Sequence, residues 1–160
     1  VEDAKRYIEW YKKRWLIEEL FRIVKSEGFR IEEASLGSGM ALKKLAAVSL
    51  FAALSALTMK RALTERIGQT DCETYFDKDM IDVLKICQSK YDMKEKITKA
   101  RGNRFREFSL AWAAWIIARL WGWTGYDSTP PGYIRMKNGL DRLFDRYEFF
   151  LQLTKMEKDV

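Results

Sequence analysis

Apolar residues recur at helical spacing through most of the chain, and a two-residue alternation is confined to a short segment at 29–33. This spacing predicts helices rather than strands. Five helices are expected, at about 3–27, 40–67, 80–89, 107–121 and 133–155. Only two prolines and nine glycines interrupt the 160 residues, and few breaking residues favour long helices. The predicted fold class is all-α, with no internal repeat.

The first predicted helix has two unlike faces when each residue advances the side-chain direction by about 100°. The apolar face, which is expected to be buried, consists of Leu16, Ile17, Leu20, Ile23 and Val24, with Phe21 at its edge. The opposite sector consists of Tyr11, Arg14, Trp15, Glu18, Arg22 and Lys25. One carboxylate therefore lies among cations and aromatic rings that are suited to holding phosphate. Such a face on a long helix is more often simply exposed to solvent, so both interpretations stay open.

The sequence also predicts where the second and third helices end and begin, and which later segments are buried or exposed. Gly68 is expected to end the second helix, and Asp79 to cap the start of the third. The stretch 90–106 holds seven cations against two carboxylates, which predicts a solvated loop or, less strongly, a DNA-backbone contact loop. Trp112 and Trp115 in the fourth helix fit a buried core better than a base-stacking platform. The fifth helix has apolar residues on more than one side, which is typical of a helix that packs against a second subunit.

Composition narrows the chemistry. The chain has 29 basic and 23 acidic residues, a net charge of +6, which is compatible with a polyanionic partner. It has no histidine and only two cysteines, Cys72 and Cys87. This excludes the usual zinc-finger spacings and any Ser–His or Cys–His nucleophile pair, and both cysteines are expected to be free thiols. The most apolar run, 45–57, has about 13 residues, too few to span a bilayer. A soluble, cytoplasmic protein is expected.

The spacing Tyr11-x2-Arg14-x3-Glu18-x6-Lys25, embedded in YxxRWxIEExF, resembles the Y-R-E-K signature of the insertion-sequence-four family of bacterial DDE transposases. Segments 30–33 and 110–120 and the closing PPGYIRMKNGLDRL are also similar to that family, whereas 65–105 match loosely. The resemblance therefore extends over most of the chain.

The resemblance implies roles for single residues. In that family an RNase H-like sheet carries two aspartates, and a glutamate on a following helix completes a site for two Mg²⁺ or Mn²⁺ ions that cleave and join DNA at transposon ends. Glu18 matches this third metal-binding carboxylate. Tyr11, Arg14 and Lys25 match the DNA-contacting residues of the signature, and Arg30 is assigned to DNA by the similarity downstream. Arg22 is added from geometry alone, because it lies on the same face.

The resemblance also implies a division of the chain. Residues 1–35 would be the end of the catalytic core, and 36–160 a helical C-terminal domain for dimerisation and DNA-end contact. The chain begins in helix-like sequence without an initiator Met, and we interpret it as part of a longer DNA-transposition enzyme. Because the two aspartates and the sheet are missing from it, the chain alone is expected to be inactive, while the parent would be a homodimer.

Two alternatives stay open. The chain could be a helical dimerisation or scaffold module with no chemistry of its own, in which the fifth helix and the Trp-rich helix are the functional surface. It could also be a general nucleic-acid-binding domain, an interpretation that rests on the charge of 90–106 alone.

Overall fold

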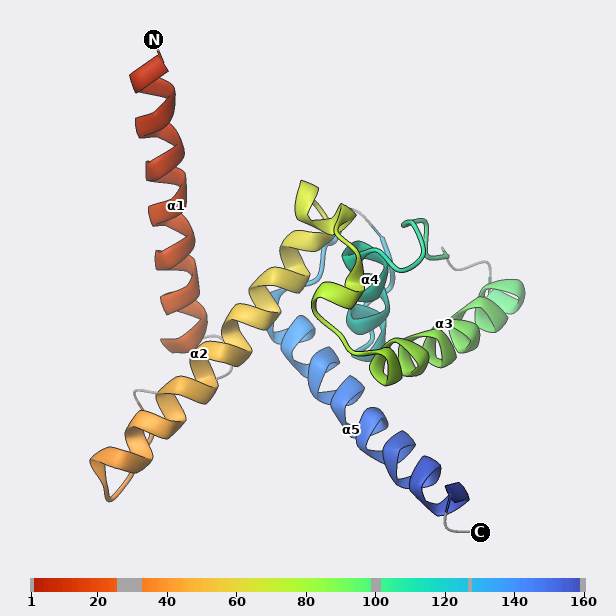
Figure 1. The fold of residues 1–160 in the computed structure, drawn as a ribbon. Helices are drawn as coiled ribbons and strands as arrows, with labels where there is room; N and C mark the ends of the chain where they lie inside the picture. Colours follow the sequence, from red (N-terminus) through yellow and green to blue (C-terminus); the bar gives the residue numbers. More distant parts are fainter. Residues whose placement is uncertain (1, 26–32, 99–101, 127, 159–160) are drawn as a thin grey trace. The chain divides into compact units, whose positions relative to one another are not determined.

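The structure, a computed structural model, describes residues 2–25, 33–98, 102–126 and 128–158. Its elements in chain order are α1 (Glu2–Lys25), α2 (Gly39–Ala62), the 3₁₀ helices η2 (Arg66–Gln69) and η3 (Cys72–Thr74), α3 (Lys78–Thr98), α4 (Leu110–Leu120) and α5 (Tyr133–Lys158) (Figure 1). The described ranges contain no strand beyond one isolated bridge between Asp71 and Ser109. The all-α prediction is confirmed.

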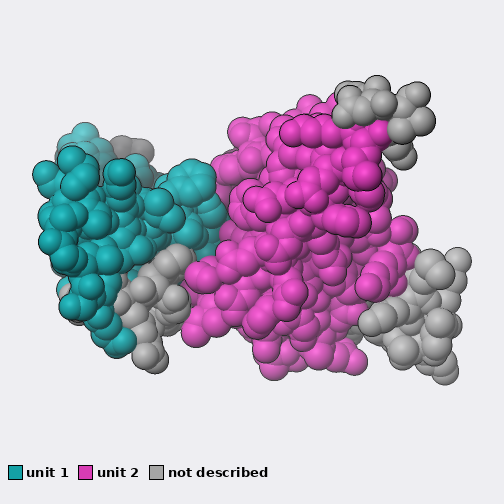
Figure 2. All heavy atoms as spheres, turned by 90° about the horizontal axis from the view of Figure 1, so that it is seen from below, with its two compact units in different colours: residues 1–57 teal, residues 58–160 magenta. Residues whose placement is uncertain are grey.

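The chain divides into two compact units, residues 1–57 and 58–160, so that the division falls inside α2 (Figure 2). We refer to them as unit 1 and unit 2. This division reflects packing within the chain. The predicted boundary after residue 35 concerns the parts of a larger protein, and it stays a prediction.

Unit 2 is organised around α4, in which every residue from Leu110 to Ala118 is buried. Helices α3 and α5 and the 3₁₀ helix η2 pack around it. Trp112 and Trp115 are almost fully buried, and the indole nitrogen of Trp112 donates a hydrogen bond to the Gln88 side chain. The prediction that these tryptophans belong to the core is confirmed, because buried rings cannot offer a stacking platform to bases.

The N-terminus of α4 lies three residues later than predicted. Phe108 has φ of +62°, a left-handed conformation that an α-helix cannot include. Ser109 follows as the N-cap, and its hydroxyl accepts a hydrogen bond from the backbone N–H of Trp112 at 3.2 Å. These two residues therefore set the start of the helix at Leu110.

Glycine allows two close approaches in unit 2. A Cβ at Gly139 on α5 would overlap the carbonyl oxygen of Ile117 on α4, so only glycine lets the two helices come this close. A Cβ at Gly68 would overlap the carbonyl oxygen of Ala62 in the same way. The predicted helix 40–67 was therefore too long: α2 ends at Ala62, and Gly68 belongs to η2, which folds back onto that end.

Helix α3 is longer than predicted and has a different cap. The backbone N–H of Met80 donates to Oδ1 of Asp77 at 2.8 Å, so Asp77 caps the helix and Asp79 lies in its first turn. The helix continues to Thr98, so the first part of the charged stretch 90–106 is helical, and the predicted loop is wrong there. Lys, Glu and Met are good helix formers, and 90–98 contains no glycine or proline.

Helix α5 confirms that its apolar residues occupy more than one side. Its inner side buries Tyr133, Met136, Leu140 and Leu143, while Ile134, Phe144, Phe149, Leu153 and Met156 are exposed.

Cys72 and Cys87 are both buried free thiols in unit 2, as predicted. Burial raises the pKa of the Cys72 thiol above its ordinary value.

The predicted apolar stripe of α1 is buried only at its C-terminal end. Ile23 and Val24 are buried and Leu16 and Leu20 are half-buried, but Ile17 is 56% exposed. The expectation of a continuous buried stripe is therefore wrong for this chain. Within unit 1, no described element packs along α1 for most of its length, so nothing covers the stripe there.

Helix α2 is one helix that is long and apolar enough to span a membrane by length and composition alone. The run 45–57 led us to underestimate the length of this apolar helix, because the 24-residue α2 continues past both ends of that run. One such helix is weak evidence for a membrane span, since core helices of soluble proteins meet the same criterion. No other described helix meets it.

Candidate functional site

The face of α1 singled out in the sequence contains a connected row of side chains. Arg14 Nη1 lies 2.8 Å from Glu18 Oε1 in an ion pair. Its Nη2 donates to the Tyr11 hydroxyl at 3.4 Å, and its guanidinium carbon lies 4.9 Å from the centre of the Tyr11 ring. The spacings of three and four residues place these groups over successive turns of one helix face. The helix alone therefore brings together three of the four signature residues.

The electrostatics of this row are those of an exposed surface. The hydrogen bond with Tyr11 and then the charge of Glu18 raise the pKa of Arg14 above its ordinary value, so this guanidinium is a permanent cation. Half of the Glu18 side chain is exposed. Solvent screens such an exposed pair, which therefore adds little to helix stability. The row therefore contributes little to the fold, and its side chains are open to a ligand.

Arg22 and Lys25 lie in the last turn of α1. Arg22 Nη2 lies 3.9 Å from Oε1 of Glu19, the residue next to Glu18, beside which we had expected it. Cations in the last turn also stabilise the helix dipole, which gives these two residues a structural role whether or not they bind DNA. Arg30, the remaining predicted contact, lies outside the described residues.

The described residues do not by themselves fit the divalent ions that the resemblance implies. Mg²⁺ takes several oxygen ligands in near-octahedral geometry. Glu18 forms an ion pair with Arg14, and Glu19 projects about 100° around the helix from Glu18. No described group of three or more carboxylate, thiol or imidazole side chains could hold a metal ion. Glu18 can therefore supply one ligand, and the others have to come from elsewhere.

Several aspartates of unit 2 are engaged in structural contacts. Asp71 forms an ion pair with Arg106 at 2.7 Å, and Asp82 forms one with Lys85 at 2.8 Å. Asp77 caps α3 and also accepts a hydrogen bond from the Tyr147 hydroxyl at 2.8 Å. These three carboxylates therefore have structural roles within unit 2.

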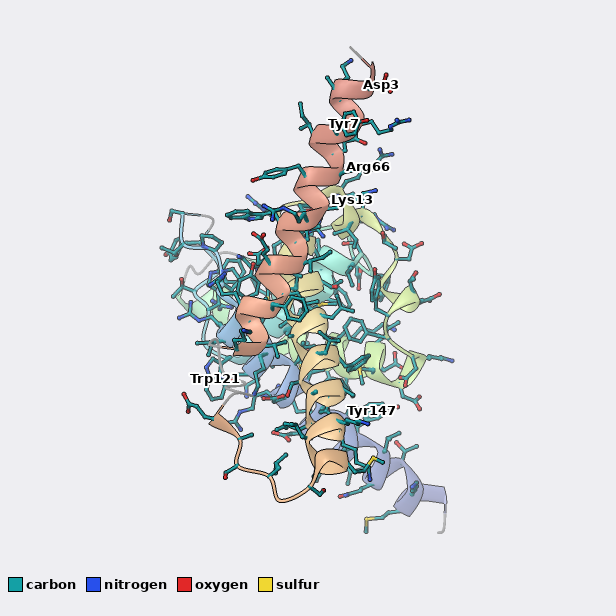
Figure 3. All side chains as sticks on the ribbon, turned by 90° about the vertical axis from the view of Figure 1, so that its left-hand side faces the viewer. Asp3, Tyr7, Lys13, Arg66, Trp121 and Tyr147 are labelled. Atoms are coloured by element: carbon teal, nitrogen blue, oxygen red, sulfur yellow. The ribbon has the colours of Figure 1, made fainter. Side chains whose placement is uncertain are left out.

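The sequence reasoning missed a second aromatic and cationic cluster on α1, one turn before Tyr11. The guanidinium carbon of Arg6 lies 6.0 and 5.9 Å from the ring centres of Tyr7 and Trp10, and the two rings meet edge to face. Figure 3 marks Tyr7 on α1, between Asp3 and Lys13. The signal was present, because Tyr7 precedes Tyr11 by four residues and therefore extends the same face.

No protein-family model matches the chain, and no curated protein matches it. The functional interpretation therefore depends on the residues themselves.

Proposed function

We propose that the chain is the C-terminal part of a cut-and-paste DDE transposase, in which α1 supplies Glu18 as the third metal-binding carboxylate. The observation that carries this proposal is the exposed row of Tyr11, Arg14 and Glu18 at the signature spacing. The row contributes little to stability, so its combination of groups is better explained by a ligand than by the fold.

The exposed apolar surface of α1 supports the proposal independently of the signature. Trp10, Ile17 and Phe21 are all more than half exposed, and they lie beside the Glu18 face within one sector of the helix. A helix that is apolar on several sides is normally buried in a larger body. A sheet that covered this sector could bring its carboxylates next to Glu18.

The cations of α1 fit a DNA ligand. Arg14, Arg22 and Lys25 occupy about one side of the helix over three turns, and Arg14 already holds the Tyr11 ring against its guanidinium. Phosphate contacts from such residues position DNA without reading its sequence. In the parent protein, Tyr11, Arg14, Lys25 and Arg30 would contact the transposon end, with Arg22 as a further backbone contact. The parent would act in the cytoplasm on bacterial DNA.

The parent's two Mg²⁺ or Mn²⁺ ions would supply Lewis-acid chemistry at the scissile phosphate when bound. Glu18 would hold one of them through a carboxylate oxygen, and the ion pair with Arg14 at 2.8 Å would orient that carboxylate. Because the described residues offer Glu18 no further carboxylate, the chain alone is expected not to cleave DNA.

The test is Glu18→Gln in the intact parent, with Glu19→Gln as the matched control. Strand cleavage should fall by about a thousandfold or more in the first variant, because one metal ligand is lost. Binding to transposon ends should stay near the parental level in both variants, and cleavage should persist in the second. Cleavage retained by Glu18→Gln would refute the proposal.

A second candidate function, a helical dimerisation module without chemistry of its own, is favoured by one observation. Ile134, near the start of α5, is half exposed and projects about 100° around the helix from the buried Tyr133. Exposed apolar residues on a terminal helix are typical of a subunit interface. Sedimentation equilibrium should show a dimer that Ile134→Glu dissociates. A chain that stays monomeric at high concentration would rule out dimerisation through α5 alone.

A further inference from the structure

An open groove lies between α3 and α5 in unit 2, with a volume of about 520 Å³. Helix α3 contributes Val83, Ile86 and Lys90, and α5 contributes Arg146, Phe149 and Leu153. Each set has the spacing i, i+3, i+7, so each helix lines the groove over two turns, or about 10.5 Å. Ile86 and Phe149 are 58% and 61% exposed. These are large apolar side chains that gain from being covered.

The charge of the groove has one sign. Among the described residues that line it, the charged ones are Lys90 and Arg146, and none is acidic. Arg146 Nη1 donates a hydrogen bond to the buried Cys87 Sγ at 3.1 Å, which holds the guanidinium at the wall of the groove. An occupant that matches this surface carries apolar side chains in its centre and carboxylates toward these two cations.

The dimensions favour a helix as the occupant. Small-molecule sites usually enclose most of their ligand, whereas this groove is open along one side. An amphipathic helix that places apolar residues at i, i+3 or i+4, and i+7 spans the same two turns as the lining of the groove.

The same charges disfavour a second copy of this chain. Arg135, Arg142 and Arg146 recur at i, i+7 and i+11 on α5, which puts them within about 40° of one another around the helix. A second α5 that entered the groove by this side would bring arginines against Arg146 and Lys90. Like charges brought together in this way oppose association.

We propose that the α3–α5 groove binds an acidic amphipathic helix of another protein, with the apolar side of that helix on Ile86, Phe149 and Leu153 and its carboxylates on Lys90 and Arg146. The groove lies in unit 2 and shares no residue with the Glu18 face, so the proposal does not depend on the transposase function.

Two synthetic helical peptides test the charge preference on the full chain. Both carry leucine at i, i+3, i+4 and i+7, and their remaining positions are glutamate in one peptide and lysine in the other. Fluorescence anisotropy should show that the acidic peptide binds about tenfold or more tightly than the basic one. Lys90→Glu should reduce the ratio of the two affinities by about threefold or more. Lys155→Glu, elsewhere on the surface, should leave this ratio unchanged.

Matched phenylalanine variants locate the site. Phe149→Ser should weaken binding of the acidic peptide by about tenfold, and Phe144→Ser, an exposed position on the other side of α5, should change it by less than about twofold. Both residues are exposed, so both variants should keep the near-UV circular dichroism of the parent chain. Equal binding of the two peptides, or equal effects of the two variants, would overturn the proposal.

Photo-crosslinking in cells identifies the natural occupant. A photoreactive phenylalanine analogue in place of Phe149, in the full-length protein, should crosslink to an acidic amphipathic segment of a different protein. Crosslinks only to a second copy of the chain, or to a segment without acidic residues, would contradict the proposal.

Discussion

The two units of the chain differ in how they use their apolar residues. In unit 2, α4 is buried over nine consecutive residues and other helices pack around it. In unit 1, Tyr7, Ile8, Trp10, Tyr11, Trp15, Ile17, Phe21, Leu36, Met40, Leu42, Val48, Leu50, Phe51 and Leu54 are exposed. Among the described residues of unit 1, the buried apolar ones are Ile23, Val24, Ala53, Ala56 and Leu57. Unit 2 therefore has a hydrophobic core of its own. Unit 1 is also rich in large apolar side chains, but most of them are exposed.

This difference is consistent with the proposed function of α1. A helix with apolar residues on several sides is stable in a larger body that covers those sides. In the proposed function, the body that covers α1 would also supply further carboxylates beside Glu18. On that proposal, the exposed apolar surface of α1 and the single carboxylate of Glu18 have one common explanation.

The largest contrast between the units should come from a pair of tryptophans. Trp115 is 2% exposed and meets the Tyr91 ring edge to face at 6.1 Å. Trp115→Ala should lower the free energy of unfolding of unit 2 by about 3–5 kcal/mol. Trp15, which is 62% exposed, should change stability by less than about 0.5 kcal/mol when replaced by alanine. Urea denaturation followed by circular dichroism measures both, and similar losses would remove the contrast.

A pair of glycines gives a smaller contrast of the same kind. Gly139→Ala should lower the free energy of unfolding by about 1–3 kcal/mol, because the added Cβ overlaps the Ile117 carbonyl oxygen and forces α4 and α5 apart. Gly37→Ala in unit 1 meets no atom within 4 Å, so it should leave the melting temperature nearly unchanged. A Gly139→Ala variant with parental stability would show that the two helices can separate without cost.

These elements also show which parts of the fold were predictable from the sequence. The periodicity of the long segments was sufficient to predict five helices. The Trp-rich helix could be assigned to the core because its apolar residues lie on all sides. The start of α4 could not be predicted, because it depends on the left-handed conformation of Phe108, which phenylalanine does not favour. Asp77 and Asp79 are equally good caps by residue type, and only the structure distinguishes them.

The candidate site was predictable in part. The row of Tyr11, Arg14 and Glu18 follows from helical spacing alone, since the contacts run within one helix. The partner of Arg22 was not predictable, because Glu18 and Glu19 lie at i−4 and i−3 and are both within reach. The burial of the α1 stripe was wrongly expected, because periodicity shows which side is apolar but cannot show whether another element covers it.

Alkaline pH should weaken unit 2 more than unit 1. Burial raises the pKa of Cys72, and the hydrogen bond to Asp77 raises the pKa of Tyr147. A raised pKa in the folded state means that the stabilisation is complete below the unfolded-state pKa and is lost as the pH rises toward the folded-state value. For the thiol this loss should begin near pH 8.5.

Chemical denaturation between pH 7 and pH 10 measures this effect. The stability of unit 2 should decline with pH, and Cys72→Ala should flatten the decline at the cost of lower stability at pH 7. A Cys72→Ala variant with the parental pH slope would show that the thiol does not contribute.

The smallest effect is expected at the Arg14–Glu18 pair. Glu18→Gln in the chain alone should change stability by no more than about 0.5 kcal/mol, and salt should reduce even that. A loss of several kcal/mol would mean that Glu18 serves the fold, and it would remove the argument that this carboxylate is available to a ligand.

Metal rescue in the intact parent tests the central claim most directly. Glu18→Cys replaces a hard oxygen ligand with a softer thiolate, which disfavours Mg²⁺ relative to Mn²⁺. Strand cleavage by this variant should be lost in Mg²⁺ and restored in part by Mn²⁺, while Glu19→Cys should cleave like the parent in either ion. Full activity of Glu18→Cys in Mg²⁺ would contradict the assignment of Glu18 as a metal ligand.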